Sequence, residues 1–254
     1  MKYFRIQFAL ILLLISQLVT AAAKPSALMG QGNDLYKNGK YEDAVTSYQL
    51  LVKEGYLSSE LYFNLGNAYF KMKNYPMAVL YFEKASLLDP SDDEISYNLG
   101  YTRLLTGDKL EGVEEFFLIR WKRSIINLMS YEEWAWSSVI AFVVTLVLFG
   151  AYLFTRSRQI KIMTFWIAVL LLLFSAGSFA MASVQHSTIK NSHTAIVMSA
   201  SVTVKSSPSD NGSDLFVIHD GTKVSILQRS GEWAEVKISD GNRGWMKVAD
   251  FAVI

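Results

Sequence analysis

Hydrophobic residues are concentrated in three uninterrupted blocks, separated by stretches in which polar and apolar residues are mixed. The first block, Phe8–Val19, follows the basic residues Lys2 and Arg5 and ends before Ala21–Ala23. At roughly a dozen residues it is too short to cross a bilayer comfortably as a helix. A basic start, a short apolar run and small residues are typical of a secretory signal peptide. We therefore predict a signal peptide over residues 1–23, with an uncleaved N-terminal anchor as the alternative.

The second and third blocks cover residues 134–154 and 162–182 and contain no charged residue. Apolar segments of about 20 residues match a helix that crosses a bilayer. We predict two transmembrane helices, with a helical hairpin buried in a soluble core as the alternative. The loop between them, residues 155–161, has three cations and no anion. Because short cationic loops stay in the cytoplasm, both flanking segments are expected outside it, in agreement with export by the signal peptide.

A sequence repeat runs through residues 24–121, with a period of about 34 residues. Gly32, Gly66 and Gly100 recur once in each period. The same spacing relates further small and aromatic pairs, namely Ala44 and Ala78, Tyr41 and Tyr75, Tyr36 and Phe70, and Tyr48 and Phe82. This pattern resembles the tetratricopeptide repeat, a pair of helices that stacks on its neighbours. The resemblance implies an all-α repeat stack.

The repeat units fall near residues 25–58, 59–92 and 93–121. The third unit is degenerate, because Lys109 stands where the first two have Tyr, and Gly112 stands where they have Ala. We expect this unit to end the stack. Residues 122–133 would then form a linker at the membrane interface, with basic side chains near the lipid headgroups.

Repeat stacks of this kind bind partners in the groove lined by the first helix of each unit. The family's groove positions correspond here to Asn33, Tyr36, Lys37, Phe63, Asn64, Asn67, Phe70, Lys71, Tyr97, Asn98 and Tyr101. An Asn side chain can both donate to and accept from the backbone of an extended peptide, and Asn is a poor residue for a helix interior. We therefore expect a peptide-binding groove. In the alternative, the aromatic residues form core between repeats and the Asn side chains bridge helices.

After a polar tether over residues 183–192, the pattern changes to short alternating strands within residues 193–254. Turns rich in Gly, Asp and Ser separate the strands. The predicted strands are Ala195–Met198, Val202–Lys205, Asp214–Ile218, Lys223–Gln228, Trp233–Ile238 and Gly244–Val248. Strands this short and this closely spaced indicate a small barrel.

This segment resembles the bacterial SH3-like domain, in residues 202–208, 220–224 and 231–236 and above all in the Gly-Trp pair at Trp245. The resemblance implies an all-β barrel that binds cell-wall peptides or protein segments. Trp233 and Trp245 are candidates for a binding face. Packing in the core is the alternative, and it is the commoner role of Trp at such positions.

Composition narrows the possible chemistry. The 254 residues include 24 Lys and Arg against 23 Asp and Glu, a net charge of +1 that argues against a general nucleic-acid binder. Without Cys the chain has no disulfide, thiolate nucleophile or Cys-ligated metal. His186, His193 and His219 form no i, i+4 pair, and neither predicted span has an ionisable residue. Phosphate-binding and nucleophile-elbow motifs are absent. We predict no catalytic residue, no metal site, no cofactor and no enzymatic activity.

The order of signal peptide, repeats, apolar hairpin and SH3-like domain resembles the BatE-type proteins of aerotolerance operons. The resemblance implies a multi-pass protein of the inner membrane of a Gram-negative cell, with the repeats and the SH3-like domain in the periplasm. It also implies protein partners among the von Willebrand factor A-type Bat membrane proteins and a chaperone-like ATPase, in a complex linked to aerotolerance and stress.

We expect the chain to act as a membrane-anchored scaffold or adaptor. A partner that contacts both the repeat groove and the SH3-like module would benefit from a raised effective concentration. The alternative is a cell-wall-associated protein whose SH3-like domain binds peptidoglycan and whose repeats recruit a wall enzyme. Sedimentation with purified peptidoglycan separates the two hypotheses.

Overall fold

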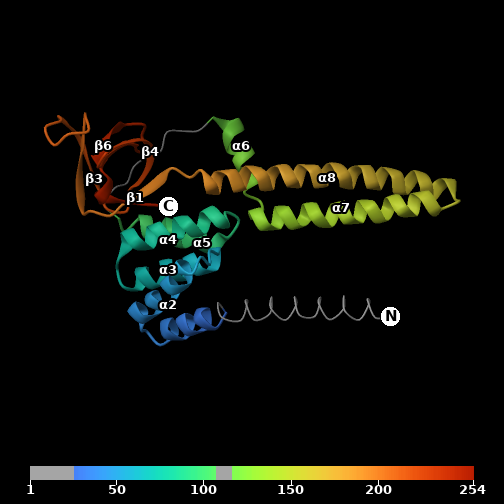
Figure 1. The fold of residues 1–254 in the computed structure, drawn as a ribbon, viewed down its shortest axis with the longest axis horizontal. Coiled ribbons are helices and arrows are strands. Elements are labelled where there is room, and N and C mark those ends of the chain that lie inside the picture. The colour runs from blue at the N-terminus through green and yellow to red at the C-terminus, as the bar shows by residue number, and fades with distance from the viewer. Residues whose placement is uncertain (1–25, 107–115) are drawn as a thin grey trace, which may run out of the picture.

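The computed structural model describes residues 26–106 and 116–254 (Figure 1). The expected signal peptide lies outside the described residues, as do Lys109 and Gly112 of the expected third repeat. The described chain forms a stack of short helices, then a long helical hairpin, then an antiparallel sheet. This order confirms the expected fold class: a tetratricopeptide-like helical stack, two long apolar helices and a small all-β SH3-like module.

The stack comprises a helix over residues 26–37, followed by α2 (Tyr41–Lys53), α3 (Ser59–Lys71), α4 (Tyr75–Leu88) and α5 (Asp93–Arg103). Side chains at the helix starts bind the first backbone N–H groups. Ser58 Oγ accepts from Leu61 N at 3.1 Å, and Asp92 Oδ1 accepts from Glu94 N at 2.8 Å. Gly39, with a φ of 76°, lies in the turn before α2, in a conformation that side chains disfavour.

The period of the repeat has a packing cause. Gly66 on α3 lies against the ring of Phe82 on α4, where an added Cβ would come within 2.6 Å of two ring carbons. Gly32 lies against the ring of Tyr48 in the same way, at 2.3 Å. Both rings are almost completely buried. The two helices of a unit therefore approach this closely because the residue at the contact has no side chain.

The third unit lacks this contact. Nothing lies within 4 Å of the Cβ position of Gly100 on α5. Phe116, which follows Phe82 by one period of the repeat, is 60% exposed and precedes α6. Within the described residues, α5 is therefore the part of the third unit that joins the stack.

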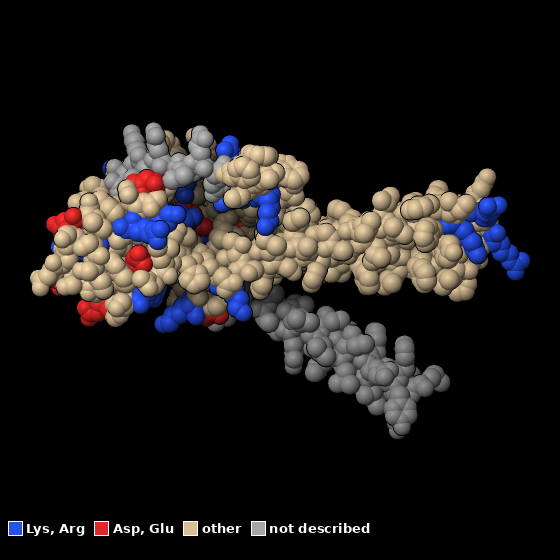
Figure 2. All heavy atoms as spheres, turned by 90° about the horizontal axis from the view of Figure 1, so that it is seen from above, with Lys and Arg blue, Asp and Glu red and all other residues tan. Residues whose placement is uncertain are grey.

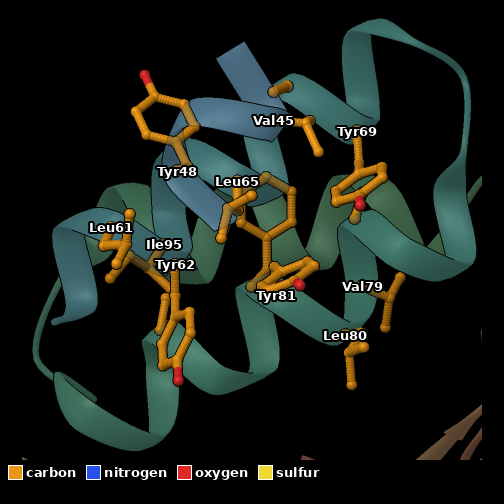
Figure 3. Packing of buried hydrophobic residues seen from close by; sticks show 14 of the residues in the cluster. Val45, Tyr48, Leu61, Tyr62, Leu65, Tyr69, Val79, Leu80, Tyr81 and Ile95 are labelled. Atoms are coloured by element: carbon orange, nitrogen blue, oxygen red, sulfur yellow. The ribbon is translucent and has the colours of Figure 1, made fainter. Parts of the chain in front are cut away.

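Aromatic residues fill the space between α3 and α4 (Figure 3). Tyr69 and Tyr81 stack with ring centroids 5.4 Å apart, and Tyr62 lies 6.0 Å from Tyr81. Burial raises the pKa of all three phenols, because the phenolate would lose its hydration. These side chains therefore remain neutral at physiological pH and act as core.

The hairpin follows α6 (Phe117–Ile126) and consists of α7 (Tyr131–Phe154) and α8 (Arg158–Lys190), which lie side by side (Figure 1). Between them, Ser138 Oγ donates to Ser175 O at 3.0 Å and Ser175 Oγ donates to Ser138 O at 2.9 Å. In Figure 2 the shaft of the hairpin shows no charged side chain and its tip shows a basic cluster. Both helices are long and apolar enough to cross a membrane.

The helices extend beyond the expected apolar segments. The expected loop 155–161 is reduced to residues 155–157, and the expected tether 183–192 is helical as far as Lys190. The expected linker 122–133 contains the end of α6, a short turn and the start of α7. Polar residues continue a helix wherever the backbone hydrogen bonds continue, so hydrophobicity alone located the apolar part of each helix and missed its ends.

The sheet has seven strands in the order β3-β2-β6-β5-β4-β1-β7. They are β1 (Thr194–Val197), β2 (Ser201–Lys205), β3 (Asp214–His219), β4 (Lys223–Ser230), β5 (Trp233–Lys237), β6 (Arg243–Lys247) and β7 (Phe251–Val253). The first six agree closely with the predicted strands. The seventh, β7, was not predicted; it follows a short 3₁₀ helix, Val248–Asp250, and pairs with β1.

The sheet packs on the helical stack. Ile196 of β1 is completely buried and belongs to the same apolar cluster as α4, with Ala252 and Ile254 packed around it. Lys223 Nζ on β4 lies 2.6 Å from Glu83 Oε2 on α4. Helical stack and sheet therefore share a core and an ion pair.

Candidate functional site

The four candidate Asn residues form two hydrogen-bonded pairs between successive first helices of the repeat. Asn64 Nδ2 donates to Asn33 Oδ1 at 3.1 Å, and Asn98 Nδ2 donates to Asn67 Oδ1 at 3.0 Å. Asn33 Oδ1 also accepts from Tyr48 Oη at 2.7 Å. The second pair follows the first by one period, so the arrangement belongs to the repeat itself.

Each pair retains hydrogen-bonding capacity. Within the described part of the chain, Asn33 Nδ2 and Asn67 Nδ2 donate no hydrogen bond, and Asn64 Oδ1 and Asn98 Oδ1 accept none. All four side chains are partly exposed. Each pair can therefore offer one donor and one acceptor to a ligand, which is the pattern that a peptide backbone requires. The Asn residues bridge helices and still present polar groups.

The candidate aromatic residues divide by exposure. Tyr97 and Tyr101 on α5 are 72% and 49% exposed, and their parallel rings lie 6.5 Å apart. Phe70 on α3 is half-buried, 5.9 Å from Tyr101. Phe63 is half-buried against Phe82, at 5.8 Å. Among these candidate aromatic residues, the most exposed apolar area therefore lies on α5.

The candidate aromatic residue of the first unit is less exposed than those on α5. Tyr36 is half-buried, with its ring 5.4 Å from that of Tyr41. Lys37 and Lys71 are exposed at the ends of their helices. Burial raises the pKa of Tyr48 to about 12, with smaller contributions from Tyr36 and Glu60. Tyr48 is therefore a neutral hydroxyl donor to Asn33 and holds that amide in place.

The two candidate Trp side chains lie on one face of the sheet. In β5 the buried residues are Ala234 and Val236, so alternation directs Trp233 away from the core. Trp245 of β6 pairs with Glu235, and Trp233 pairs with Lys247, which places all four on that same face. Lys247 Nζ lies 5.4 Å from the centroid of the Trp233 ring and 2.8 Å from Asp210 Oδ1.

This geometry matches a recognition face better than a core. Both Trp residues are partly exposed, while their neighbours Ala234 and Met246 are buried. Partly exposed aromatic rings beside charged side chains can stack on sugar rings or on the side chains of a peptide segment. The alternation of these strands therefore places both Trp side chains outside the row of buried residues.

Sequence reasoning missed Glu83. Its side chain is 6% exposed and binds both Arg103 of α5 and Lys223 of β4. A charged residue within the apolar helix α4 was the available signal, because a buried carboxylate requires cationic partners. The sequence could not indicate that one of those partners lies 140 residues away.

The described residues contain no group of three or more His, Asp or Glu side chains that could hold a metal ion. Their three histidines lie apart, at the end of α8, before β1 and at the end of β3. The candidate site is thus composed of amides, aromatic rings and amines, which are groups suited to recognition.

Comparison with known proteins identifies two modules. Residues 59–92 match the tetratricopeptide repeat, and residues 200–251 match the bacterial SH3 domain. The first match covers α3 and α4, and the second covers β2 to β6 with part of β7. No curated protein is similar enough to this chain to count as a relative.

Several solved structures share a weak overall likeness. The PcrH structure in complex with the chaperone-binding region of PopB is 13% identical, with a TM-score of 0.31, and the match covers 65% of this chain and 93% of that one. The type III secretion translocator chaperone SycD of Yersinia enterocolitica is 17% identical, with a TM-score of 0.29, and the match covers 60% of this chain and 83% of that one. MamA is 18% identical, with a TM-score of 0.32, and the match covers 68% of this chain and 85% of that one. Scores this low support no argument about function. What the comparisons establish is a chain with a tetratricopeptide repeat and a bacterial SH3 domain, two modules of protein-interaction adaptors.

Proposed function

We propose that this chain is a non-enzymatic adaptor of the bacterial inner membrane. In this proposal α7 and α8 cross the bilayer, the basic loop lies in the cytoplasm, and the helical stack and the SH3-like sheet face the periplasm. The apolar outer surface of the hairpin and the basic cluster at its tip support this orientation. The resemblance to BatE-type proteins adds von Willebrand factor A-type Bat proteins as candidate partners and an aerotolerance or stress complex as the setting.

The repeated Asn pairs are the observation on which the adaptor role depends. Each pair offers a donor and an acceptor, and the two pairs lie on neighbouring first helices beside the exposed rings of Tyr97 and Tyr101. An extended protein segment could place its backbone along the amides and its apolar side chains on the rings. We therefore assign the groove to a protein segment of a partner.

Photo-crosslinking in cells tests the groove. A photoreactive residue at Tyr97 should give a discrete adduct, because that side chain is 72% exposed beside the Asn pairs. The same residue at Leu57, which is 60% exposed in the turn before α3, is the matched control. Adding Asn64→Ala and Asn98→Ala should abolish the Tyr97 adduct. An adduct that also forms at Leu57, or one that survives the Asn substitutions, would contradict the groove assignment.

The absence of Cys provides a test of orientation. Single substitutions Leu57→Cys, Ser157→Cys and Asn242→Cys place thiols on the stack, the hairpin tip and the sheet. In intact spheroplasts a membrane-impermeant maleimide should label positions 57 and 242, and position 157 only after permeabilisation. Labelling of position 157 in intact spheroplasts would refute the proposed topology.

The outward-facing Trp side chains favour a second candidate function, binding of peptidoglycan by the SH3-like sheet. Aromatic faces stack on sugar rings, and the ion pairs Lys247–Asp210 and Lys205–Asp214 beside them add polar groups for a wall peptide. The detergent-solubilised chain should then sediment with purified peptidoglycan, and Trp245→Ala should remain in the supernatant. Equal sedimentation of both proteins, or of neither, would exclude this function for the Trp face.

A further inference from the structure

Helix α6 exposes large apolar side chains. Phe117, Leu118 and Trp121 are 63%, 52% and 66% exposed, although the helix has only ten residues. The helix contains basic residues and no acidic residue. Contiguous exposed apolar surface of this kind marks an interaction site.

The two sides of α6 differ. Ile119 and Ile126 face a crevice of about 1060 Å³ between the stack, α8 and the sheet. Phe117, Leu118 and Trp121 lie on another side, together with Arg120 and Ser124. Since successive helical residues are about 100° apart, the apolar side spans roughly 100°, with Arg120 at one border and Lys122 at the other. An apolar side flanked by cations is typical of helices that lie on membranes.

The C-terminal end of α6 is held at one end of the apolar hairpin. Trp134 Nε1 donates to Ile126 O at 3.0 Å, and Gln185 Nε2 donates to Ile126 O and to Met129 O, both at 2.9 Å. Trp134 and Gln185 are buried and come from α7 and α8. Trp134 is also the first residue of the uncharged segment of α7. In Figure 1, α6 crosses the direction of the hairpin beside the last part of α8, on the side away from α7.

Within the described residues, Phe116 does not occupy the position on the helical stack that the repeat would give it. In the repeat register, Phe116 would pack on Gly100 as Phe82 packs on Gly66, yet Gly100 has no heavy atom within 4 Å of its Cβ position. The apolar side chains around Phe116 are thus diverted from the stack toward the hairpin end.

We propose that α6 is an interfacial helix that lies on the periplasmic surface of the bilayer and binds anionic phospholipid. Phe117, Leu118 and Trp121 enter the boundary between headgroups and acyl chains, and Arg120 and Lys122 contact anionic headgroups. The contacts of Trp134 and Gln185 fix the position of α6 along the hairpin axis. The contact of α6 with the bilayer surface then orients the helical stack and its candidate groove. This inference rests on the proposed insertion of α7 and α8.

Spin labels on single Cys substitutions test this inference in the full chain, which has no native Cys. The protein is placed in nanodiscs of phosphatidylcholine and phosphatidylglycerol, and collisions of the label with oxygen and with a water-soluble nickel chelate are compared. Trp121→Cys should give a several-fold higher ratio of oxygen to nickel collisions than Leu57→Cys, which is also highly exposed. Leu118→Cys provides a second label on the same side if the first variant does not fold.

A label at Val143, which is 51% exposed on α7, separates the two proposals. If Val143→Cys reports the bilayer core while positions 118 and 121 report water, the interfacial helix is refuted and the membrane anchor stands. If Val143→Cys itself reports water, α7 is not inserted in the bilayer. Both the membrane anchor and the interfacial position of α6 are then refuted.

The charge requirement has its own test. Arg120→Gln with Lys122→Gln should lower the collision ratio at position 121 several-fold, as should nanodiscs of phosphatidylcholine alone. Lys40→Gln with Lys53→Gln removes the same charge from exposed positions at the two ends of α2 and should leave the ratio unchanged. A ratio that is insensitive to both lipid charge and the α6 cations would refute the anionic-lipid part of the proposal.

Discussion

Substitution of Gly66 tests the packing that underlies the repeat. An added Cβ would lie 2.6 Å from Phe82 Cδ1 and Cε1 and 3.0 Å from Cγ, whereas carbon atoms pack at about 3.5–4.0 Å. Phe82 is completely buried and has Phe63 beside it, so its ring cannot turn aside freely. Gly66→Ala therefore forces the ring, the helix or both to shift.

The expected free-energy change follows from two opposed effects. Overpacking of a core costs about 1–3 kcal/mol. Replacing a helical Gly by Ala stabilises the helix by about 0.5–1 kcal/mol. Gly66→Ala should therefore destabilise the stack by about 1–2 kcal/mol. Gly100→Ala is the matched control, because its Cβ would meet nothing within 4 Å and should be neutral or stabilise by up to about 1 kcal/mol.

Thermal unfolding of the full chain in detergent, followed by far-UV circular dichroism, measures both variants. The predicted free-energy difference of about 2 kcal/mol corresponds to a gap of about 4–8 °C between their Tm values. Gly66→Ala should unfold below the native protein and Gly100→Ala at or above it. Equal Tm values for the two variants, or a more stable Gly66→Ala, would refute the close-approach explanation of the repeat period.

Two further predictions concern buried ionisable groups. Arg103→Ala and Lys223→Ala should each lower the free energy of unfolding by at most about 1 kcal/mol, because the other cation remains with Glu83. The double variant should lower it by about 3–5 kcal/mol, because it leaves a buried carboxylate unpaired. Urea unfolding of the four proteins measures this coupling, and additive losses would contradict it. The pKa of Tyr48 is raised from 10.0 to about 12 in the folded protein. The neutral phenol therefore contributes fully to the free energy of unfolding below pH 10.0, and this contribution is lost as the pH rises to about 12. The native protein should therefore lose more stability than Tyr48→Phe between neutral pH and this alkaline range, and equal losses by urea unfolding would show that Tyr48 is not responsible.

The helical period was predictable because the contacts that cause it are local. Gly66 and Phe82 belong to one helical pair, on consecutive helices, and a Gly packed on an aromatic ring recurs at Gly32 and Tyr48. The strands β1 to β6 were predictable for a similar reason, because alternation and Gly-rich turns act over a few residues. The short strand β7 was missed, because three residues after a 3₁₀ helix show no alternation and only pairing with β1 makes them a strand.

The candidate groove was predictable in its residue types and not in its geometry. Because Asn is a poor residue for a helix interior, the sequence indicated that these Asn side chains have a specific structural or binding role. Only the packing of neighbouring helices shows that Asn64 and Asn98 donate to the Asn residues 31 positions before them. The division of the aromatic residues into exposed Tyr97 and half-buried Phe63 likewise depends on which helix has a neighbour.

The sequence by itself determined the order of modules, the repeat, the two apolar helices and the strand pattern, because each of these depends on periodicity within a short segment. The tertiary structure decided that the sheet packs on α4, that Glu83 joins Arg103 to Lys223, and that α6 is held at the hairpin end by Trp134 and Gln185. These contacts join residues up to 140 positions apart. No local pattern encodes such pairs, because they form only when segments far apart in the sequence pack on the same apolar surface or bind the same buried carboxylate.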